Sequence, residues 1–278
     1  MARCEVCFRH CEIPEGGVGF CGGRICENGE VRAGNYGKLT GIALDPIEKK
    51  PLRRFHPGSM ILSVGSYGCN LRCPFCQNFG ISWSEEAKER AAEARFVPPE
   101  ELVRLALETR SRENIGLAFT YNEPLIGWEY VRDTAKPAHE AGLKNVLVTN
   151  GTAELPVLEA LLPYTDAMNI DLKGFSEHYY THTLGGNLEM VKAFITRAVR
   201  DTHVELTTLI IPGENDSEEE MRRMTEWISV LSPEIPLHIS RFFPRFHMTD
   251  RPATDVRKIY HLAEVAREKL KYVYTGNC

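Results

Sequence analysis

From Ser59 to the C-terminus, short apolar segments of strand length alternate with longer amphipathic segments of helix length. The apolar segments are near-continuous runs rich in Val, Ile and Leu, which is typical of parallel strands buried on both faces. The predicted strands are residues 60–64, 115–121, 145–149, 167–171, 204–211 and 237–240, with a shorter one at 272–274. Strand–helix units connect through right-handed crossovers. About six units predict an α/β fold, a partial (β/α)6 barrel of the TIM type, with a doubly wound open sheet as the alternative.

The chain divides into three zones. Residues 1–35 are rich in Cys and Gly and show little periodicity, which predicts a small lobe stabilised by metal. Residues 36–58 carry several prolines and basic side chains, and we expect them to be a connector. Residues 59–278 form the predicted barrel.

Helix starts are marked by residues that suit the first turn. Asp216, with Glu219 three positions later, resembles a capping box, and Thr254 suits the N-cap of the last helix. Pro98 and Pro99 open another helix. These positions predict where three of the connecting helices begin.

Nine cysteines stand at positions 4, 7, 11, 21, 26, 69, 73, 76 and 278, and in a reducing compartment such spacing favours metal over disulfides. Cys69, Cys73 and Cys76 follow the first predicted strand with the spacing C-x3-C-x2-C. Three thiolates on one loop can bind three irons of a [4Fe–4S] cluster and leave the fourth iron open to another ligand. The alternative is a zinc site completed by a distant Cys or His.

With this loop after the first strand of a (β/α) series, and Phe75 directly before the third cysteine, the chain resembles the radical S-adenosylmethionine (SAM) superfamily. In that superfamily the C-x3-C-x2-C loop binds a [4Fe–4S] cluster, and SAM chelates the fourth iron. The resemblance implies an oxidoreductase that cleaves SAM reductively to methionine and a 5′-deoxyadenosyl radical, which abstracts hydrogen from a substrate.

Within the superfamily, the chain is similar to the glycyl-radical-enzyme activases, such as those of pyruvate formate-lyase. The similarity rests on Thr149-Asn150-Gly151, on Asp171-Leu172-Lys173 and on residues 210–213. It also resembles the radical SAM enzymes of the AmmeMemoRadiSam system, which share the Cys-rich N-terminus. Further shared features are residues 44–52, 120–124 and 240–242. These resemblances imply reduced ferredoxin or flavodoxin as electron donor, and Memo-family and AMMECR-type proteins as partners.

The resemblance to the activases also implies roles for polar residues that follow the strands. Lys173 would contact the SAM carboxylate and Asp171 its ribose or amino group, while a simple surface ion pair is the alternative. If the strand persists that far, period-2 alternation points both side chains the same way and Leu172 the opposite way.

Glu123 lies where the activases have Gly-Gly-Glu-Pro, a stretch that reads Tyr121-Asn122-Glu123-Pro124 in this chain. Because a buried carboxylate without a partner is costly, we expect Glu123 to face a cation or amine. The remaining predicted cofactor-binding residues are Phe75, Asn122, Thr149, Asn150 and Ser240. Thr149 and Asn150 also suit an ordinary turn.

The N-terminal cysteines are a second candidate metal site. Cys4, Cys7, Cys11 and Cys21 offer four thiolates, enough for tetrahedral zinc or for a second iron–sulfur cluster. The spacing leaves both open, and His10 or Cys26 could replace one ligand.

The formal net charge of −5 gives no overall attraction to nucleic acid or to an anionic membrane. No apolar run has the length of a signal peptide core or a membrane span, so we expect a cytoplasmic protein. The substrate is not defined by these features. A glycyl-radical-enzyme activase and, in another class, a zinc-binding adaptor protein are the alternative functions.

Overall fold

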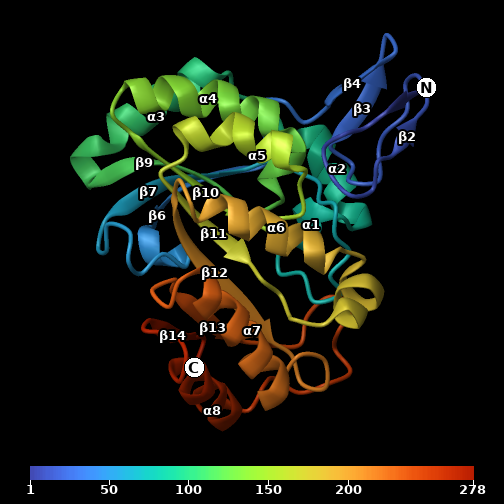
Figure 1. Ribbon diagram of the computed structural model, residues 1–278. Coiled ribbons are helices and arrows are strands. Elements are labelled where there is room, and N and C mark those ends of the chain that lie inside the picture. The colour runs from blue at the N-terminus through green and yellow to red at the C-terminus, as the bar shows by residue number, and fades with distance from the viewer.

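The computed structural model describes residues 1–278, and eight strands form its main sheet (Figure 1). Their order across the sheet is β14-β13-β12-β11-β10-β9-β7-β6. Only the edge strand β6 is antiparallel to its neighbour, and all other pairs are parallel. The strands are β6 (Gly41–Pro46), β7 (Met60–Gly65), β9 (Asn114–Phe119), β10 (Lys144–Thr149), β11 (Ala167–Asp171), β12 (His203–Ile210), β13 (Leu237–Arg241) and β14 (Val273–Gly276).

The order of the parallel strands follows the chain from β7 to β14. A doubly wound sheet would reverse direction at a switch point, so that alternative is excluded. The predicted partial barrel is confirmed, with the short segment near residue 273 as a further parallel strand. Because β6 and β14 are not paired with each other, the barrel stays open along one side.

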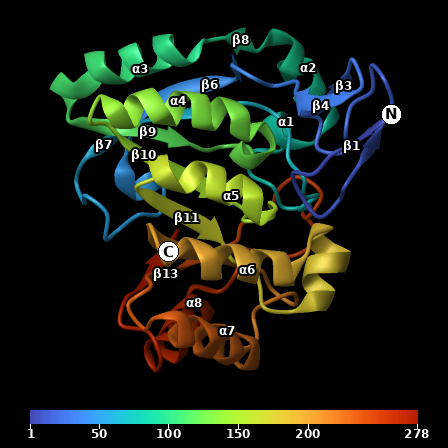
Figure 2. The ribbon, with the colours of Figure 1, turned by 45° about the horizontal axis from the view of Figure 1, so that its top comes forward.

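Six helices follow the strands in turn and cover the outer face of the sheet (Figures 1 and 2). Their apolar side chains and the outward residues of the strands, such as Leu147 and Met168, form one hydrophobic core. Burial of this shared apolar surface holds the layers together. The helices are α3 (Pro99–Glu108), α4 (Trp128–Glu140), α5 (Leu155–Leu161), α6 (Leu188–Ala198), α7 (Glu218–Leu231) and α8 (Val256–Arg267), while α1 (Phe79–Ser82) and α2 (Glu85–Glu93) precede them.

Two of the predicted helix caps are wrong by one residue. Ser217 caps α7, because its hydroxyl accepts the backbone N–H of Glu220 at 3.1 Å. Asp255 caps α8 by accepting the N–H of Arg257 at 2.8 Å. The hydroxyl of Thr254 instead donates to the carbonyl of Ile210 and is fully occupied in joining the last loop to β12.

Part of the segment 36–58, which we expected as a connector, belongs to the barrel itself. Residues 41–46 are the edge strand β6. Beyond it, Ile47 and Leu52 are completely buried against inward-facing strand residues such as Ala118 and Ala167. The segment therefore closes the floor of the barrel, at the end where the strands begin. Its apolar residues are too scattered for periodicity to reveal this role.

The N-terminal lobe is built from two short antiparallel ladders, β1 (Ala2–Arg3) with β2 (Glu12–Ile13), and β3 (Arg24–Glu27) with β4 (Glu30–Ala33). An ion pair of 2.7 Å between Arg24 and Glu129 joins the lobe to α4. Figures 1 and 2 show the lobe beside α1 and α2, the helices that follow the predicted cluster loop. None of the helices is long and apolar enough to cross a membrane.

Candidate cofactor site at the carboxyl ends of the strands

The loop with the three predicted cluster ligands begins directly after β7. Cys73 is buried, and Cys69 and Cys76 are half-buried. Burial raises the pKa of the Cys73 thiol to about 12 and that of the Cys69 thiol well above its usual range. Because metals bind the thiolate form, these sulfurs need a strong positive charge beside them to ionise.

The loop thiols suit a cluster better than a single ion. The loop offers three thiols, and no further Cys or His follows them on the same segment. Ligands of one zinc ion must all lie about 2.3 Å from the same point, whereas the thiolates of a cubane bind separate irons. The donor set of the loop, three thiolates and no fourth ligand, therefore fits a [4Fe–4S] cluster with one open iron.

Polar side chains from the loop and from β10 hold the loop in place. The guanidinium of Arg72 donates to the carbonyls of Cys69 and Leu71, both at 2.8 Å. The side-chain amide of Asn150 donates to Asn70 Oδ1 at 2.9 Å and approaches Cys69 Sγ at 3.7 Å. Asn150 thus connects the end of β10 to the first cluster cysteine.

Within the protein, Glu123 faces neutral donors and no cationic side chain, and its contact with a cation or amine of a ligand stays a prediction. Its carboxylate is buried and accepts hydrogen bonds from Thr149 Oγ1 at 2.6 Å, from the N–H of Asn150 at 2.8 Å and from the N–H of Leu125 at 3.0 Å. Burial raises the pKa of Glu123 to about 7, although these hydrogen bonds oppose the shift. Three neutral donors satisfy the carboxylate, so Glu123 and Thr149 brace the site from behind.

The side chain of Asn122 also hydrogen-bonds backbone groups. Its Oδ1 accepts the N–H of Ser66 at 2.9 Å, and its Nδ2 donates to the carbonyls of Tyr67 and Gly68, both at 3.1 Å. All of these partners lie in the segment that leads from β7 into the cluster loop. Asn122 therefore shapes the entry to the loop.

Asp171 and Lys173 lie together beside the cluster loop. Lys173 Nζ is 2.7 Å from Asp171 Oδ2, and Leu172 between them is completely buried on the other side. Burial opposes the charge of Lys173, but Asp171 and the thiol of Cys73 outweigh it and raise the pKa of the lysine. An ammonium and a carboxylate that share one edge of the site suit a zwitterionic ligand.

Sequence reasoning missed the residues that position Lys173. The hydroxyl of Tyr180, in the π-helix η5 (Tyr179–Leu184), accepts the N–H of Lys173 at 3.0 Å. Asn215 Nδ2 donates to the carbonyl of Lys173 at 2.7 Å. Both partners come from loops without a recognisable motif, so no pattern in the sequence identifies them.

A strained tyrosine follows β9 where the similar activases have glycine. Tyr121 has φ of 71°, in the left-handed region that favours glycine. Its hydroxyl donates to Asp45 Oδ2 at 2.7 Å, and Lys50 Nζ donates to the same oxygen at 2.9 Å. These hydrogen bonds outweigh the effect of burial and hold the pKa of Asp45 well below its usual range. Backbone strain of this kind persists where surrounding contacts enforce it, often at functional sites.

Two predicted cofactor-binding residues stand apart from this network. Phe75 is buried in the main hydrophobic core. Ser240 lies in β13, paired with Leu209 and Gly276, and makes none of the contacts that link the other predicted residues.

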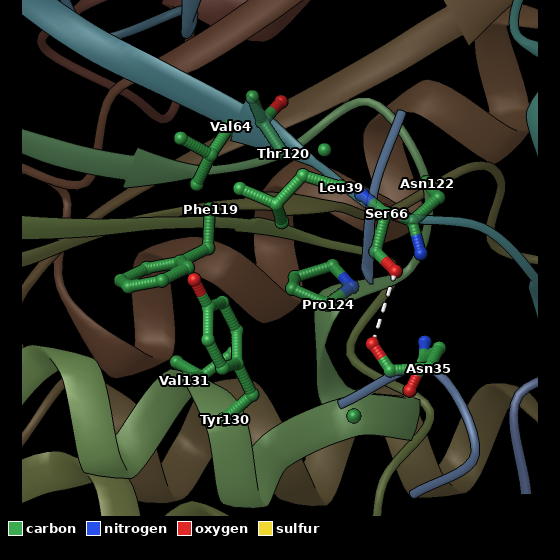
Figure 3. Close-up of a pocket in the computed structure, with 12 residues that line it drawn as sticks. Asn35, Leu39, Val64, Ser66, Phe119, Thr120, Asn122, Pro124, Tyr130 and Val131 are labelled. Atoms are coloured by element: carbon green, nitrogen blue, oxygen red, sulfur yellow. Dashed lines mark hydrogen bonds between the residues drawn. The ribbon is translucent and has the colours of Figure 1, made fainter. Parts of the chain in front are cut away.

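A small cavity lies behind the site, between the sheet and α4 (Figure 3). Asn35, Ser66 and Asn122 gather at one end, and Phe119 and Tyr130 line the other. Its volume is about 30 Å³. Drug-sized ligands occupy pockets of roughly 300–1,000 Å³, so this cavity has room for water but not for SAM.

The four N-terminal thiols line one cavity of their own. Cys4, Cys7, Cys11 and Cys21 surround it together with Arg9 and Arg24. The two substitute ligands that the sequence allowed lie beside carboxylates. His10 lies between Glu5 and Glu154, each 3.1 Å away, and Cys26 Sγ donates to Glu15 at 3.7 Å.

Comparison with known proteins adds family information. The model of the Radical SAM superfamily matches residues 63–225, more than half of the chain. An uncharacterized protein of Methanocaldococcus jannaschii is 40% identical over 278 residues, which cover 99% of this chain and 81% of that protein. The pyruvate formate-lyase 1-activating enzyme of Escherichia coli is 26% identical over 169 residues, 58% of this chain and 65% of that enzyme.

Solved structures share the fold. A radical SAM methyltransferase from Sphaerobacter thermophilus aligns with a TM-score of 0.59 at 16% identity, over 80% of this chain and 67% of that one. At this level of identity the likeness concerns the architecture of the barrel.

Proposed function

Because the chain belongs to the radical SAM superfamily, we propose that it is an enzyme that cleaves SAM reductively at a [4Fe–4S] cluster held by Cys69, Cys73 and Cys76. When bound, the cluster and SAM supply a 5′-deoxyadenosyl radical that abstracts hydrogen from the substrate. The observation that carries this proposal is the placement of three thiols on one loop beside the Asp171–Lys173 pair.

The protein residues of the site have separate tasks. Cys69, Cys73 and Cys76 hold three irons, and the missing fourth ligand leaves a place for SAM. Lys173 orients the carboxylate of SAM, and Asp171 its amino group or ribose. A charge-assisted contact of this kind typically contributes about 1.5–3 kcal/mol. No side chain is needed as a general base, because positioning and exclusion of water are the contribution of the protein.

Buried polar residues keep this arrangement rigid. Glu123 fixes Thr149 and the start of the following loop, and Asn150 ties that loop to the cluster cysteines. Each contact is buried, where an unpaired polar group would cost about 1–3 kcal/mol, so the network has one favoured arrangement.

We expect the substrate to bind at the carboxyl ends of the strands, where the active sites of such barrels lie. Deeper in the barrel the polar side chains are occupied. Asp45, Lys50 and Tyr121 hydrogen-bond one another, and Asn169 donates to the carbonyl of Pro51 in the floor segment.

A glycyl-radical enzyme is the second candidate substrate, which would make this chain an activase. The identity to the E. coli activating enzyme supports it. Two features weigh against it: Tyr121 and Asn122 replace the activase glycines, and the floor segment occupies part of the barrel. The zinc-adaptor alternative lacks support, since the family match covers the cluster loop and most of the barrel.

We further propose reduced ferredoxin or flavodoxin as the electron donor. The resemblance of residues 44–52 to the AmmeMemoRadiSam enzymes supports Memo-family and AMMECR-type proteins as partners.

Anaerobic incubation of the reconstituted protein with SAM and dithionite tests the function, with 5′-deoxyadenosine measured by chromatography. The expected result is deoxyadenosine and methionine in equal amounts. A protein that assembles the cluster but forms no deoxyadenosine, alone or with candidate substrates, would refute the proposal. Adding a glycyl-radical enzyme and recording its radical by EPR distinguishes the activase.

A further inference from the structure

We propose that Cys4, Cys7, Cys11 and Cys21 hold a redox-active iron–sulfur cluster that passes electrons to the SAM-binding cluster through the contact between Cys21 and Cys69. This inference rests on the proposed function of the Cys69 loop. The reductant is a one-electron donor of the reduced ferredoxin or flavodoxin class. The donor is oxidised as it gives one electron to the N-terminal cluster. That cluster is reoxidised when it passes the electron on and reduces the SAM-binding cluster. No bond to the protein forms or breaks.

The contacts within the lobe indicate that Cys4, Cys7, Cys11 and Cys21 are the ligands. The four thiols line a common cavity, and three of them are buried. Of the other potential ligands in the lobe, Cys26 donates to the carboxylate of Glu15, and His10 lies 3.1 Å from the carboxylates of Glu5 and Glu154. Four thiolates are the usual ligand set of [2Fe–2S] and [4Fe–4S] clusters.

Arg24 supplies an independent sign of a negatively charged group in this cavity. Its side chain lines the cavity and is only 5% exposed. The terminal nitrogens are paired, with Nη1 2.7 Å from the carboxylate of Glu129 and Nη2 3.3 Å from the carbonyl of Val31. Nε is buried and has no hydrogen-bond acceptor. An unpaired buried N–H is costly, and the sulfur of a metal–thiolate centre would accept its hydrogen bond.

The contact between the two sites favours a cluster over zinc. The four thiols surround a shared space, and Cys21 meets Cys69 through the backbone. Zinc has no redox chemistry, whereas an iron–sulfur cluster at this contact can carry electrons.

The two sets of thiols are in direct backbone contact. The N–H of Cys69 donates to the carbonyl of Cys21 at 3.0 Å, so a single hydrogen bond joins a ligand of one site to a ligand of the other. Gly68, with φ of 91°, permits this approach, because a Cβ there would lie 2.6 Å from the same carbonyl oxygen.

A cation also bridges the two sites. Arg9 Nε donates to the carbonyl of Asn70, in the cluster loop, at 2.8 Å. Its charge also interacts with the thiols of Cys7, Cys11, Cys21 and Cys69. A shared cation of this kind stabilises negative charge on either cluster, and the short contact gives the electron a direct path.

Metal analysis tests the cluster itself. In the variant with Cys69, Cys73 and Cys76 all changed to Ala, anaerobic reconstitution should leave iron and sulfide in the lobe, with an EPR signal after reduction by dithionite. Zinc without iron, or no metal at all, would overturn the proposal. This readout does not depend on SAM cleavage, so it stands even if the proposed function fails.

Electron transfer is tested with two reductants. In the variant with Cys4, Cys7, Cys11 and Cys21 all changed to Ala, dithionite should still drive deoxyadenosine formation, because it reduces the SAM-binding cluster directly. Formation driven by reduced flavodoxin should fall at least about tenfold. Equal losses with both reductants, or none with flavodoxin, would overturn the relay.

A milder substitution covers the case in which the fourfold variant does not fold. Arg24→Met should move the midpoint potential of the N-terminal cluster, followed by EPR titration, to a more negative value, because a positive charge is lost. Glu129→Gln breaks the same ion pair but keeps the Arg24 charge, and should not produce that negative shift. An unchanged potential in Arg24→Met would contradict a cluster in this cavity.

Discussion

The hydroxyl of Thr149 donates a hydrogen bond of 2.6 Å to Oε1 of Glu123, and this buried contact joins the segment after β9 to the end of β10. The second carboxylate oxygen accepts the N–H of Asn150 at 2.8 Å, and the side chain of Asn150 continues to Asn70 in the cluster loop. Glu123 therefore stabilises the cluster loop at a distance, through β10.

Glu123→Gln should destabilise the protein. The glutamine amide must turn its NH2 group either towards the N–H of Asn150 or towards Thr149 and the N–H of Leu125, so at least one buried backbone N–H loses its acceptor. We expect a loss of about 1–3 kcal/mol in the free energy of unfolding, measured by urea denaturation of the metal-free protein. Glu226→Gln, on the exposed face of α7, is the control. Equal stability of the two variants would show that the hydrogen bonds of Glu123 do not contribute to the free energy of unfolding.

Lys173→Met should weaken SAM binding while the cluster still assembles. A lost charge-assisted contact of about 1.5–3 kcal/mol corresponds to roughly a ten- to hundredfold rise in Kd. Calorimetric titration of the reconstituted variant with SAM measures this rise, and iron analysis checks the cluster. Lys192→Met, which removes a lysine paired with exposed Glu189 on α6, should bind SAM as the wild type does. An unchanged affinity in Lys173→Met would mean that the Asp171–Lys173 pair is structural.

The barrel could be predicted because its strands are continuous apolar runs, and such runs can be recognised from the sequence alone. Right-handed crossovers fix the handedness of each strand–helix unit but allow a doubly wound sheet as well, so the strand order comes from the structure. The floor could not be predicted, since Ile47 and Leu52 are isolated apolar residues in a basic, Pro-rich segment. Only the closed barrel shows which surface they cover.

The site was predictable where chemistry depends on spacing along one loop. The three cluster cysteines were predicted in this way, while the roles of Asp171 and Lys173 came from the resemblance to the activases. The neutral donors around Glu123 could not be predicted, because the protein groups that a buried carboxylate meets depend on contacts between segments far apart in sequence. Tyr180 and Asn215 could not be predicted for the same reason. Their side chains hydrogen-bond the backbone of Lys173, which lies far from Asn215 in the sequence.

Cys73→Ser and Cys76→Ala should each abolish formation of 5′-deoxyadenosine and lower the iron content of the Cys69 loop site. Three thiolates bind three of the four irons. A variant that lacks one of them binds only two irons, so the cluster is no longer held. Cys278→Ser changes an exposed thiol at the C-terminus and should retain full turnover. Turnover that persists in either loop variant would exclude this loop as the cluster site.

The floor of the barrel depends on a second buried carboxylate, far from the cluster loop. Glu205 is completely buried and accepts the backbone N–H groups of Arg53 and Arg54 at 3.0 and 2.7 Å. His203 and His238 donate to it at 3.0 and 2.6 Å. Burial alone would raise the pKa of Glu205, but these four hydrogen bonds lower it to about 2.

This lowered pKa makes the stability of the floor depend on pH. Because the pKa of Glu205 is below its value of about 4.3 in an unfolded chain, the folded state binds the proton more weakly. The stabilisation is therefore complete above about pH 4.3 and is lost as the pH falls towards 2. At roughly 1.4 kcal/mol per pKa unit, its size is about 3 kcal/mol. Glu205→Gln should lose this amount at neutral pH, measured by urea denaturation, and its difference from the wild type should shrink as acid protonates the wild-type carboxylate. A difference that stays constant down to about pH 3 would mean that the charge of Glu205 does not hold residues 53 and 54 in the floor.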